Sequence, residues 1–170
     1  YKGRCKQGAK AKDLVHTIAW GMILGNRGNS AMANFFEKSF IQMHVNLYRW
    51  SGGRIMGSVG GTPVLLLTTT GRKTGKQRTT PLGYIADGQD YLVVASNGGR
   101  PARPAWYLNL TQTPQVTIQV GGRVMQANAT TVGGEEREEK KKKVAAAAPA
   151  YAPYAQPDRA VPLVRLRVIG

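Results

Sequence analysis

Cysteine and histidine are scarce in this chain of 170 residues, and their scarcity limits the chemistry that the chain can carry. The single cysteine, Cys5, excludes an internal disulfide framework and a metal site built from cysteines alone. The two histidines, His16 and His44, have no second histidine or carboxylate at ligand spacing. We therefore predict no metal site, and we expect His44 to be a packing residue.

Acidic residues are also few, because 9 Asp plus Glu stand against 24 Lys plus Arg and leave a formal charge of +15. Such an excess attracts an anionic partner, for example a phosphorylated cofactor, a nucleic acid or an acidic lipid. The basic residues are not interleaved with aromatic ones on a strand face, as single-strand binding would require. We therefore expect no specific nucleic-acid partner.

Long apolar runs are missing as well. The most apolar stretch near the N-terminus, Leu14 to Gly25, is shorter than the roughly 20 residues that span a bilayer, and it follows the basic segment Lys2 to Lys12. We interpret residues 1–33 as a tail, either a remnant of an expression vector or tag, or a native surface anchor. Residues 34–170 fit one domain, since single domains usually hold about 100 to 200 residues.

Within residues 34–170 the apolar pattern predicts more strands than helices. A first helix is expected from Asn34, as its N-cap, to a glycine stop at Gly52-Gly53. Shorter helices are expected from Pro104 to Leu110 and from Gly134 to about Ala148. Six strand patterns are joined mainly by short turns: 64–70, 78–86, 91–96, 116–120, 123–132 and 162–169. Parallel sheets need a helix between most strands, so the pattern predicts a mainly β fold, a small barrel of about six mostly antiparallel strands with flanking helices.

A basic turn, Gly71 to Arg78, carries four cations, one hydroxyl and two glycines. Glycine lets the backbone approach a ligand, and arginine can hold phosphate oxygens through two hydrogen bonds. A turn of this composition is also common as plain solvated surface. A nucleoside-triphosphate loop is excluded, because only three residues separate Gly71 from Gly75 and Gln77 stands where Ser or Thr is needed.

A second polar cluster, residues 95–104, follows an apolar strand and leads into the short helix at 105–110. Small residues at a strand end leave room for a planar ligand against the backbone. Trp106 in this helix is typical of a core residue, whereas the amide of Asn109 must find hydrogen-bond partners if it is buried.

Four motifs in this part of the chain resemble those of the deazaflavin-dependent nitroreductase family: T-G-R-K-x-G-x-x-R-x-x-P-L at 70–82, A-S-x-x-G at 95–99, P-x-W-Y-x-N-L at 104–110, and T-P at 113–114. The resemblance extends from about Phe35 to Ile169. It implies an FMN-binding-like split β-barrel that binds the reduced form of coenzyme F420 (F420H2), a deazaflavin with a phosphodiester and a glutamate tail.

By this resemblance the cofactor-binding residues fall into three groups. The phosphate and tail would be held by Arg72, Lys73, Thr74 and Arg78. The edge of the ring would be lined by Thr79, Thr80 and Pro81. The ring itself would be framed by Val94, Ala95, Ser96, Asn97, Ala105, Trp106, Tyr107, Leu108 and Asn109. Asn97 departs from the lysine that some relatives carry at this position.

The implied activity is that of an F420-dependent quinone reductase or nitroreductase, an oxidoreductase that transfers a hydride from the reduced deazaflavin to a quinone, enone or nitroaromatic acceptor. Menaquinone is the expected physiological acceptor. Ser96 and Tyr84 are candidates for hydrogen-bonding the acceptor oxygen, and Tyr151 and Tyr154 match tyrosines that line the acceptor pocket of the family. No other catalytic residue is predicted, because the cofactor carries the reactive bond.

One segment departs from the family. Where relatives usually have Leu-Trp and an aromatic–proline pair, this chain has Lys140 to Lys143 and Ala147-Ala148-Pro149, and the tyrosine expected at 148 is absent. Loss of those large side chains is expected to widen or loosen the acceptor side. This departure favours an alternative function, a non-catalytic F420 or flavin carrier or sensor.

We expect a cytoplasmic location. Membrane association, as a peripheral contact with the inner face of the plasma membrane, is a further hypothesis, because the surface is cationic and the expected quinone is lipid-soluble.

Overall fold

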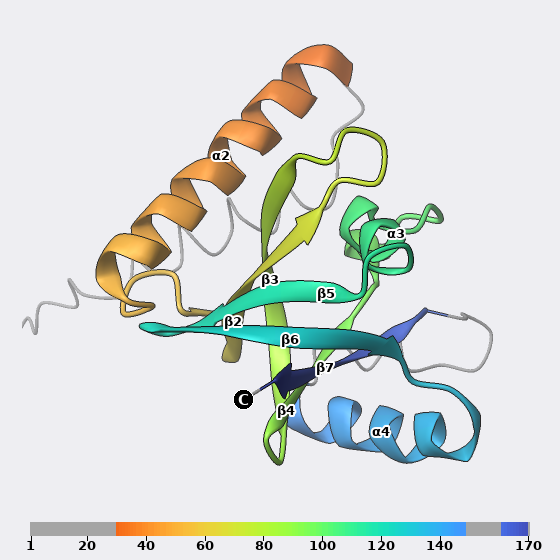
Figure 1. Ribbon diagram of the computed structural model, residues 1–170. Coiled ribbons are helices and arrows are strands. Elements are labelled where there is room, and N and C mark those ends of the chain that lie inside the picture. The colour runs from red at the N-terminus through yellow and green to blue at the C-terminus, as the bar shows by residue number, and fades with distance from the viewer. Residues whose placement is uncertain (1–29, 149–160, 170) are drawn as a thin grey trace, which may run out of the picture.

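The computed structural model describes residues 30–148 and 161–169, and their core is a closed antiparallel barrel (Figure 1). Around the barrel the strand order is β2-β3-β4-β7-β6-β5, and pairing of β2 with β5 closes the ring. The predicted mainly β barrel is therefore confirmed. Its six strands are β2 (Thr62–Thr70), β3 (Gln77–Asp87), β4 (Asp90–Val94), β5 (Gln115–Val120), β6 (Arg123–Thr131) and β7 (Leu163–Ile169). The sequence did not predict β1 (Ser58–Val59), a two-residue strand that pairs with β2.

Strand β2 is buried on both faces, which explains its continuous apolar run. Alternate side chains of a strand point to opposite faces. Leu65 and Leu67 accordingly join the main core cluster with Val93, Ile118 and other barrel residues, whereas Val64 and Leu66 join a second cluster under α2 (Ser30–Ser51).

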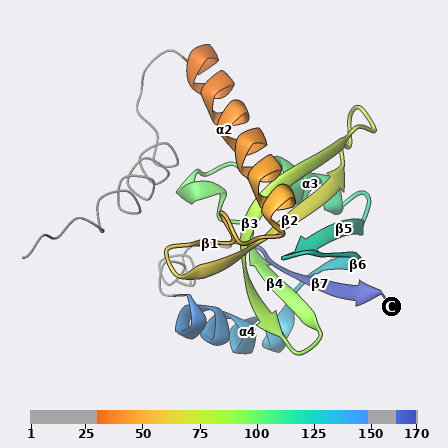
Figure 2. The same cartoon turned by 90° about the vertical axis from the view of Figure 1, so that its left-hand side faces the viewer.

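Helix α2 covers one side of the barrel, and α4 (Gly134–Ala147) lies on the opposite side (Figures 1 and 2). Val45 and Tyr48 of α2 are buried against β2. The helix begins at Ser30, four residues before the N-cap predicted at Asn34. Asparagine is a good cap, but here the helical backbone runs through it.

The C-terminal end of α2 meets the β5–β6 hairpin at a close contact. The Tyr48 hydroxyl donates a hydrogen bond to the Val64 carbonyl and accepts one from the Gly121 N–H, each at 2.8 Å. Burial raises the pKa of Tyr48, so this hydroxyl stays protonated. Gly53 has φ +79° and lies so near that a Cβ there would be 2.9 Å from the Gly121 Cα, and the predicted glycine stop is therefore also a requirement of packing.

His44 behaves as the packing residue that we predicted. It is buried, and its Nε2 lies 3.1 Å from the Met56 carbonyl oxygen, to which it donates. Burial lowers the pKa of His44, and the hydrogen bond to Met56 opposes this shift in part.

Helix α4 is held to the barrel by ion pairs as well as by apolar contacts. Lys140 Nζ and Lys143 Nζ lie 3.1 Å and 2.6 Å from the two carboxylate oxygens of Asp87, at the end of β3. Val144 is buried in a small cluster with Ile85 and other residues of the adjacent strands. Lys140 and Lys143 thus attach this helix to the barrel electrostatically.

Among residues 30–148 and 161–169, no helix combines the length and apolar character that a membrane crossing requires.

Candidate functional site

The predicted phosphate-binding residues form the tip of the β2–β3 hairpin. The Gly71 N–H donates to the Lys76 carbonyl at 2.9 Å, and the Gly71 carbonyl accepts from the Thr74 and Gly75 N–H groups at 3.1 and 2.7 Å. Gly75 has φ +65°, a left-handed conformation that favours glycine. The turn is therefore tightly hydrogen-bonded. Arg72 and Lys73 lie within the short segment that the hydrogen bonds to the Gly71 carbonyl close.

The cations of this turn form no ion pairs among the described residues. In the part of the chain that the structure describes, Arg72, Lys73, Lys76 and Arg78 form no ion pair with Asp or Glu, and all four are exposed. Four like charges on one hairpin tip repel one another, and an anionic ligand would relieve that repulsion. The turn thus has the donors and the charge for a phosphodiester or a carboxylate.

The predicted ring-edge residues lie on two different faces of β3. Thr79 is opposite Thr68 on the outer face, where their hydroxyl oxygens are 2.8 Å apart and Arg49 Nη2 of α2 donates to Thr79 at 3.2 Å. Arg78 is opposite Thr69, which is buried, and Thr80 points to the same side as Arg78. Thr79 and Pro81 therefore cannot contact a ligand from the same side as Arg78 and Thr80.

The edge of β3 offers a second way to contact a ligand. β4 pairs with β3 only over Tyr84–Asp87, so among the described residues no strand covers the other edge of Gln77 to Gly83. Unpaired strand edges present backbone N–H and C=O groups in a row. Consecutive residues such as Thr79, Thr80 and Pro81 could thus line a planar ring through their backbone.

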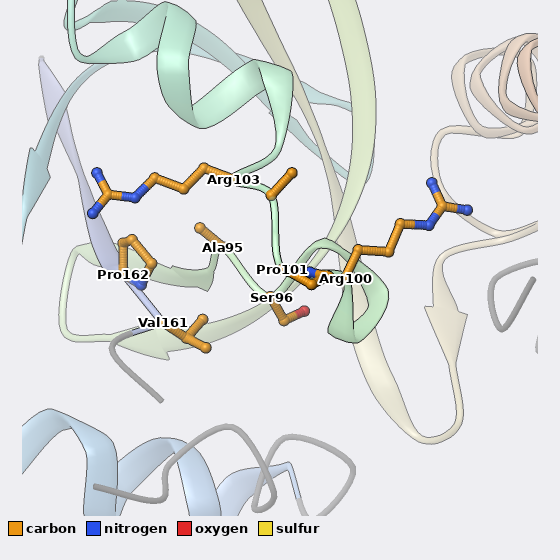
Figure 3. Close-up of a pocket in the computed structure, with 8 residues that line it drawn as sticks. Ala95, Ser96, Arg100, Pro101, Arg103, Val161 and Pro162 are labelled. Atoms are coloured by element: carbon orange, nitrogen blue, oxygen red, sulfur yellow. The ribbon is translucent and has the colours of Figure 1, made fainter. Parts of the chain in front are cut away.

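The loop that follows β4 lines a cavity of about 170 Å³. Of the predicted ring-framing residues, Ala95 and Ser96 line it. The Ala95 N–H donates to the Pro162 carbonyl at 2.9 Å, which closes the cavity against the start of β7. Figure 3 shows the side chains of Arg103 and Arg100 extending to opposite sides of this cavity. Its full lining is Ala95, Ser96, Arg100, Pro101, Ala102, Arg103, Val161 and Pro162.

The remaining members of the predicted 94–97 group shape the loop. Val94 ends β4 and packs against the cluster under α4, and Asn97 has φ +50°. The Asn97 Nδ2 donates to the Ala102 carbonyl at 2.7 Å, and this bond holds the loop closed over five residues. Asparagine tolerates this left-handed conformation better than most residues, so Asn97 has a structural role whatever it contacts in a ligand.

Helix α3 (Ala105–Leu110) anchors this loop to the core. Trp106 and Tyr107 are buried in the main core cluster, the Tyr107 hydroxyl is 3.2 Å from Thr131 Oγ1, and the Arg103 guanidinium lies 5.6 Å above the Tyr107 ring. Leu108 is only partly buried and packs against the same cluster. The core placement expected for Trp106 is confirmed, so Trp106 and Tyr107 can frame a ligand mainly by fixing the backbone of α3.

The structure does not bring Tyr84 to the cavity that contains Ser96. Tyr84 packs against the main core cluster, and its ring meets that of Tyr91 edge-on with centroids 5.2 Å apart. Burial, followed by the nearby Tyr48 and Tyr91, raises its pKa. Period-2 alternation places Tyr84 on the barrel side of β3, which the motif alone did not show. Tyr151 and Tyr154, the other two predicted acceptor-side residues, lie outside the described residues.

The sequence missed several residues of this region as site residues. Arg100 and Arg103 lie in the polar cluster 95–104 but were not predicted as binding residues, although both line the cavity. Their signal was available, because both are cations in the loop that follows the small residues Ala95 and Ser96. Val161 and Pro162 had no signal, because their approach to Ala95 depends on the pairing of distant strands β4 and β7.

Comparisons with known proteins identify the family and the fold. Residues 40–167 match the family model described as F420H(2)-dependent quinone reductase. An F420H(2)-dependent quinone reductase of Mycobacterium tuberculosis is 46% identical over 93 residues, which are 54% of this chain and 62% of that protein. The chain thus matches less than two thirds of the length of this curated relative.

Two solved structures share the fold at higher coverage. One, of an F420-H2 dependent reductase, is 40% identical, covers 62% of this chain and 94% of its own, and superposes with a TM-score of 0.56. The other, a domain-swapped dimer, is 34% identical, covers 78% of this chain and 98% of its own, and gives a TM-score of 0.58.

Proposed function

The chain belongs to the F420H(2)-dependent quinone reductase family, and on that premise we propose that it is a reductase that transfers a hydride from F420H2 to a quinone. The observation that carries this proposal is the basic turn, whose exposed cations lack acidic partners among the described residues and stand at the end of an uncovered strand edge. A structural hairpin has no need of four unpaired like charges.

The residues present fit the cofactor. Arg72, Lys73, Lys76 and Arg78 supply charge for a phosphodiester and a glutamate tail, and the Thr74 hydroxyl can donate to a phosphate oxygen. The uncovered edge of β3 offers backbone groups to a ring, and the cavity beside Ser96 offers room for one.

When bound, reduced F420 would supply the hydride for an electron-poor acceptor. The chain's own task is then to hold ring and acceptor in contact and to exclude water. We assign the Ser96 hydroxyl, which lines the cavity, to donate a hydrogen bond to the acceptor oxygen. Menaquinone is the acceptor we propose, and nitroaromatic compounds are a secondary class.

Mixing the protein with F420H2 and menadione, and following oxidation of the cofactor by absorbance, tests this function. We expect turnover that saturates with menadione, and a Ser96→Ala variant whose kcat falls about tenfold, a larger change than that in its F420 affinity. Tight binding of F420 without turnover of menadione or a nitroaromatic acceptor would overturn the enzyme and leave the carrier or sensor. Absence of F420 binding would overturn both.

We also propose a peripheral contact with an anionic membrane, made by the C-terminal end of α2. Trp50 is 81% exposed, and Met43, seven residues before it, and Ile55, five residues after it, are also exposed. Arg49 and Arg54, both exposed, flank the tryptophan. Interfacial tryptophan beside cationic side chains is typical of membrane-surface contacts.

Sedimentation with vesicles of phosphatidylglycerol and phosphatidylcholine tests this contact. The wild type should sediment and Trp50→Ser should sediment less, whereas both should remain in the supernatant with pure phosphatidylcholine. Equal sedimentation of the two proteins would overturn the assignment to Trp50.

A further inference from the structure

Asn109 stands between the two halves of the candidate site. It is 5% exposed and lies near the end of α3. Its Nδ2 donates to Thr69 Oγ1 at 3.1 Å, and its Oδ1 accepts from the Arg72 backbone N–H at 3.2 Å. One buried amide thus joins α3 to the last residues of β2 and to the first cation of the basic turn.

The backbone of Asn109 is fixed as firmly as its side chain. Its carbonyl accepts hydrogen bonds from the Gln112 and Thr113 N–H groups at 3.1 and 3.0 Å, which end the helix. On either side, Trp106, Tyr107 and Leu110 are buried in the main core. Asn109 is therefore a rigid point from which the position of the turn can be set.

Both polar ends of the Asn109 amide are engaged within the protein. After these two hydrogen bonds the amide still has one N–H and one oxygen lone pair that could bond. The side chain is nine-tenths buried, however, and it is aimed at Thr69 and Arg72. The Arg72 N–H, in turn, is used by Asn109 and is not available to a phosphate. Asn109 is thus placed to orient the turn, and the Arg72 side chain rather than its N–H is the part of that residue that can contact a phosphate.

We propose that Asn109 is a positioning residue that sets the distance between the basic turn and the polar cluster 95–104, and so favours ligands that reach both. Segment 95–104 leads directly into α3, so the amide fixes one half of the site relative to the other. This inference rests on the proposed function, because a ligand that spans both halves is the proposed cofactor. A bound molecule gains from two contacts only when their spacing matches its own.

The test compares two ligands in equilibrium fluorescence titrations. One is F420, and the other is a deazaflavin that lacks the phosphodiester and the glutamate tail. Asn109→Ala and Thr69→Val should weaken F420 by about tenfold and about threefold, and should change the affinity for the shorter deazaflavin by less than about twofold. An equal loss for both ligands would overturn the proposal, because it would mean that Asn109 contacts the ring. No loss for F420 would overturn it as well.

Amide hydrogen exchange gives a readout that does not depend on the cofactor. Asn109→Ala should speed exchange of the Arg72 amide and leave the amides of β6 unchanged. Asn109→Asp should keep the protection, because its carboxylate can accept both from Arg72 and from the Thr69 hydroxyl. Unchanged exchange at Arg72 in Asn109→Ala would overturn the positioning role.

Asn46 provides a matched control, because it is an exposed helical asparagine whose amide accepts only from Gln42 of the same helix. Asn46→Ala should leave both affinities and the Arg72 exchange unchanged. If the wild type binds no F420 while exchange at Arg72 responds as expected, the positioning role stands and the proposed function falls. If F420 binds and Arg72 exchange does not respond, the reverse holds.

Discussion

The basic turn and helix α4 are both rich in lysine and arginine, but of these two segments only α4 forms ion pairs with acidic side chains among the described residues. Asp87, whose side chain is 10% exposed, lies within ion-pair distance of Lys140 and Lys143, and Glu138 pairs with Lys141. The turn at 71–78 has no such partners within residues 30–148 and 161–169. A count of lysines and arginines cannot separate the two segments, whereas the positions of the acidic residues within 30–148 and 161–169 can.

This difference in ion pairing predicts which segment contributes to stability and which contributes to ligand binding. A partly buried ion pair stabilises the attachment of a helix, although modestly. Unpaired like charges disfavour the folded state and are typical of sites that receive a ligand. We therefore expect substitutions in α4 and its partners to change the melting temperature, and substitutions in the turn to change ligand affinity.

The largest effect should come from the turn. The double variant Arg72→Ala, Lys73→Ala removes two charge-assisted contacts, each worth roughly 1.5 to 3 kcal/mol, and should weaken F420 by at least about a hundredfold. Its melting temperature should equal or exceed that of the wild type, because like-charge repulsion is removed. Titration of F420 and thermal unfolding measure the two quantities. A large loss of stability without loss of affinity would show that the turn serves stability rather than binding.

A smaller effect, on stability alone, is expected at Asp87. Asp87→Asn leaves Lys140 and Lys143 without their carboxylate and should lower the melting temperature by a few degrees. Affinity for F420 should stay within about twofold of the wild type, since the turn and Asp87 share no partner. A marked loss of affinity would show that α4 and the turn are coupled.

The stabilising effect of Asp87 should depend on pH. Its hydrogen bond to Lys143, followed by that to Lys140, holds the pKa of Asp87 below the ordinary value of 3.8, against the opposing effect of burial. The contribution is therefore fully present above the unfolded pKa and is lost as the pH falls through the lower folded pKa. The difference in melting temperature between wild type and Asp87→Asn should be largest at about pH 6 and should shrink below about pH 4. A difference in melting temperature that does not change with pH would contradict the stabilising role of these ion pairs.

The smallest effect is expected at Lys142, which is exposed and forms no ion pair among the described residues. Lys142→Gln should change the free energy of unfolding by less than about 0.5 kcal/mol and leave F420 affinity unchanged. It is the control for charge number, because it removes one of the four consecutive lysines without removing a contact. A loss of affinity here would mean that overall charge, rather than the turn, attracts the ligand.

Local patterns were sufficient to predict most of the fold. Apolar strand patterns bounded by turn-favouring residues located all six barrel strands to within a few residues. The N-terminal limit of α2 was less well predicted, since asparagine at 34 is compatible with both a cap and a helix interior. The two-residue strand β1 was too short to have a pattern.

The candidate site was predictable only in part. The turn at 71–78 and the strand end at 95–96 are contiguous motifs, so their composition identified them. The role of Asn109 depends on Thr69 and Arg72, about forty residues earlier in the chain, and the wall formed by Pro162 depends on the pairing of β4 with β7. Tyr84 stays a candidate for the acceptor oxygen, and its edge-on contact with Tyr91 depends on the pairing of β3 with β4, which the motif does not encode.

The position of β7 has a consequence for how the barrel assembles during synthesis. Among the described strands β7 is the last in the chain, yet it lies between β4 and β6 and pairs with both. Until it arrives, β4 and β6 each present an open edge that can pair with another chain. A nascent or truncated chain that lacks β7 should therefore be prone to aggregation. The barrel can close only after β7 has been translated.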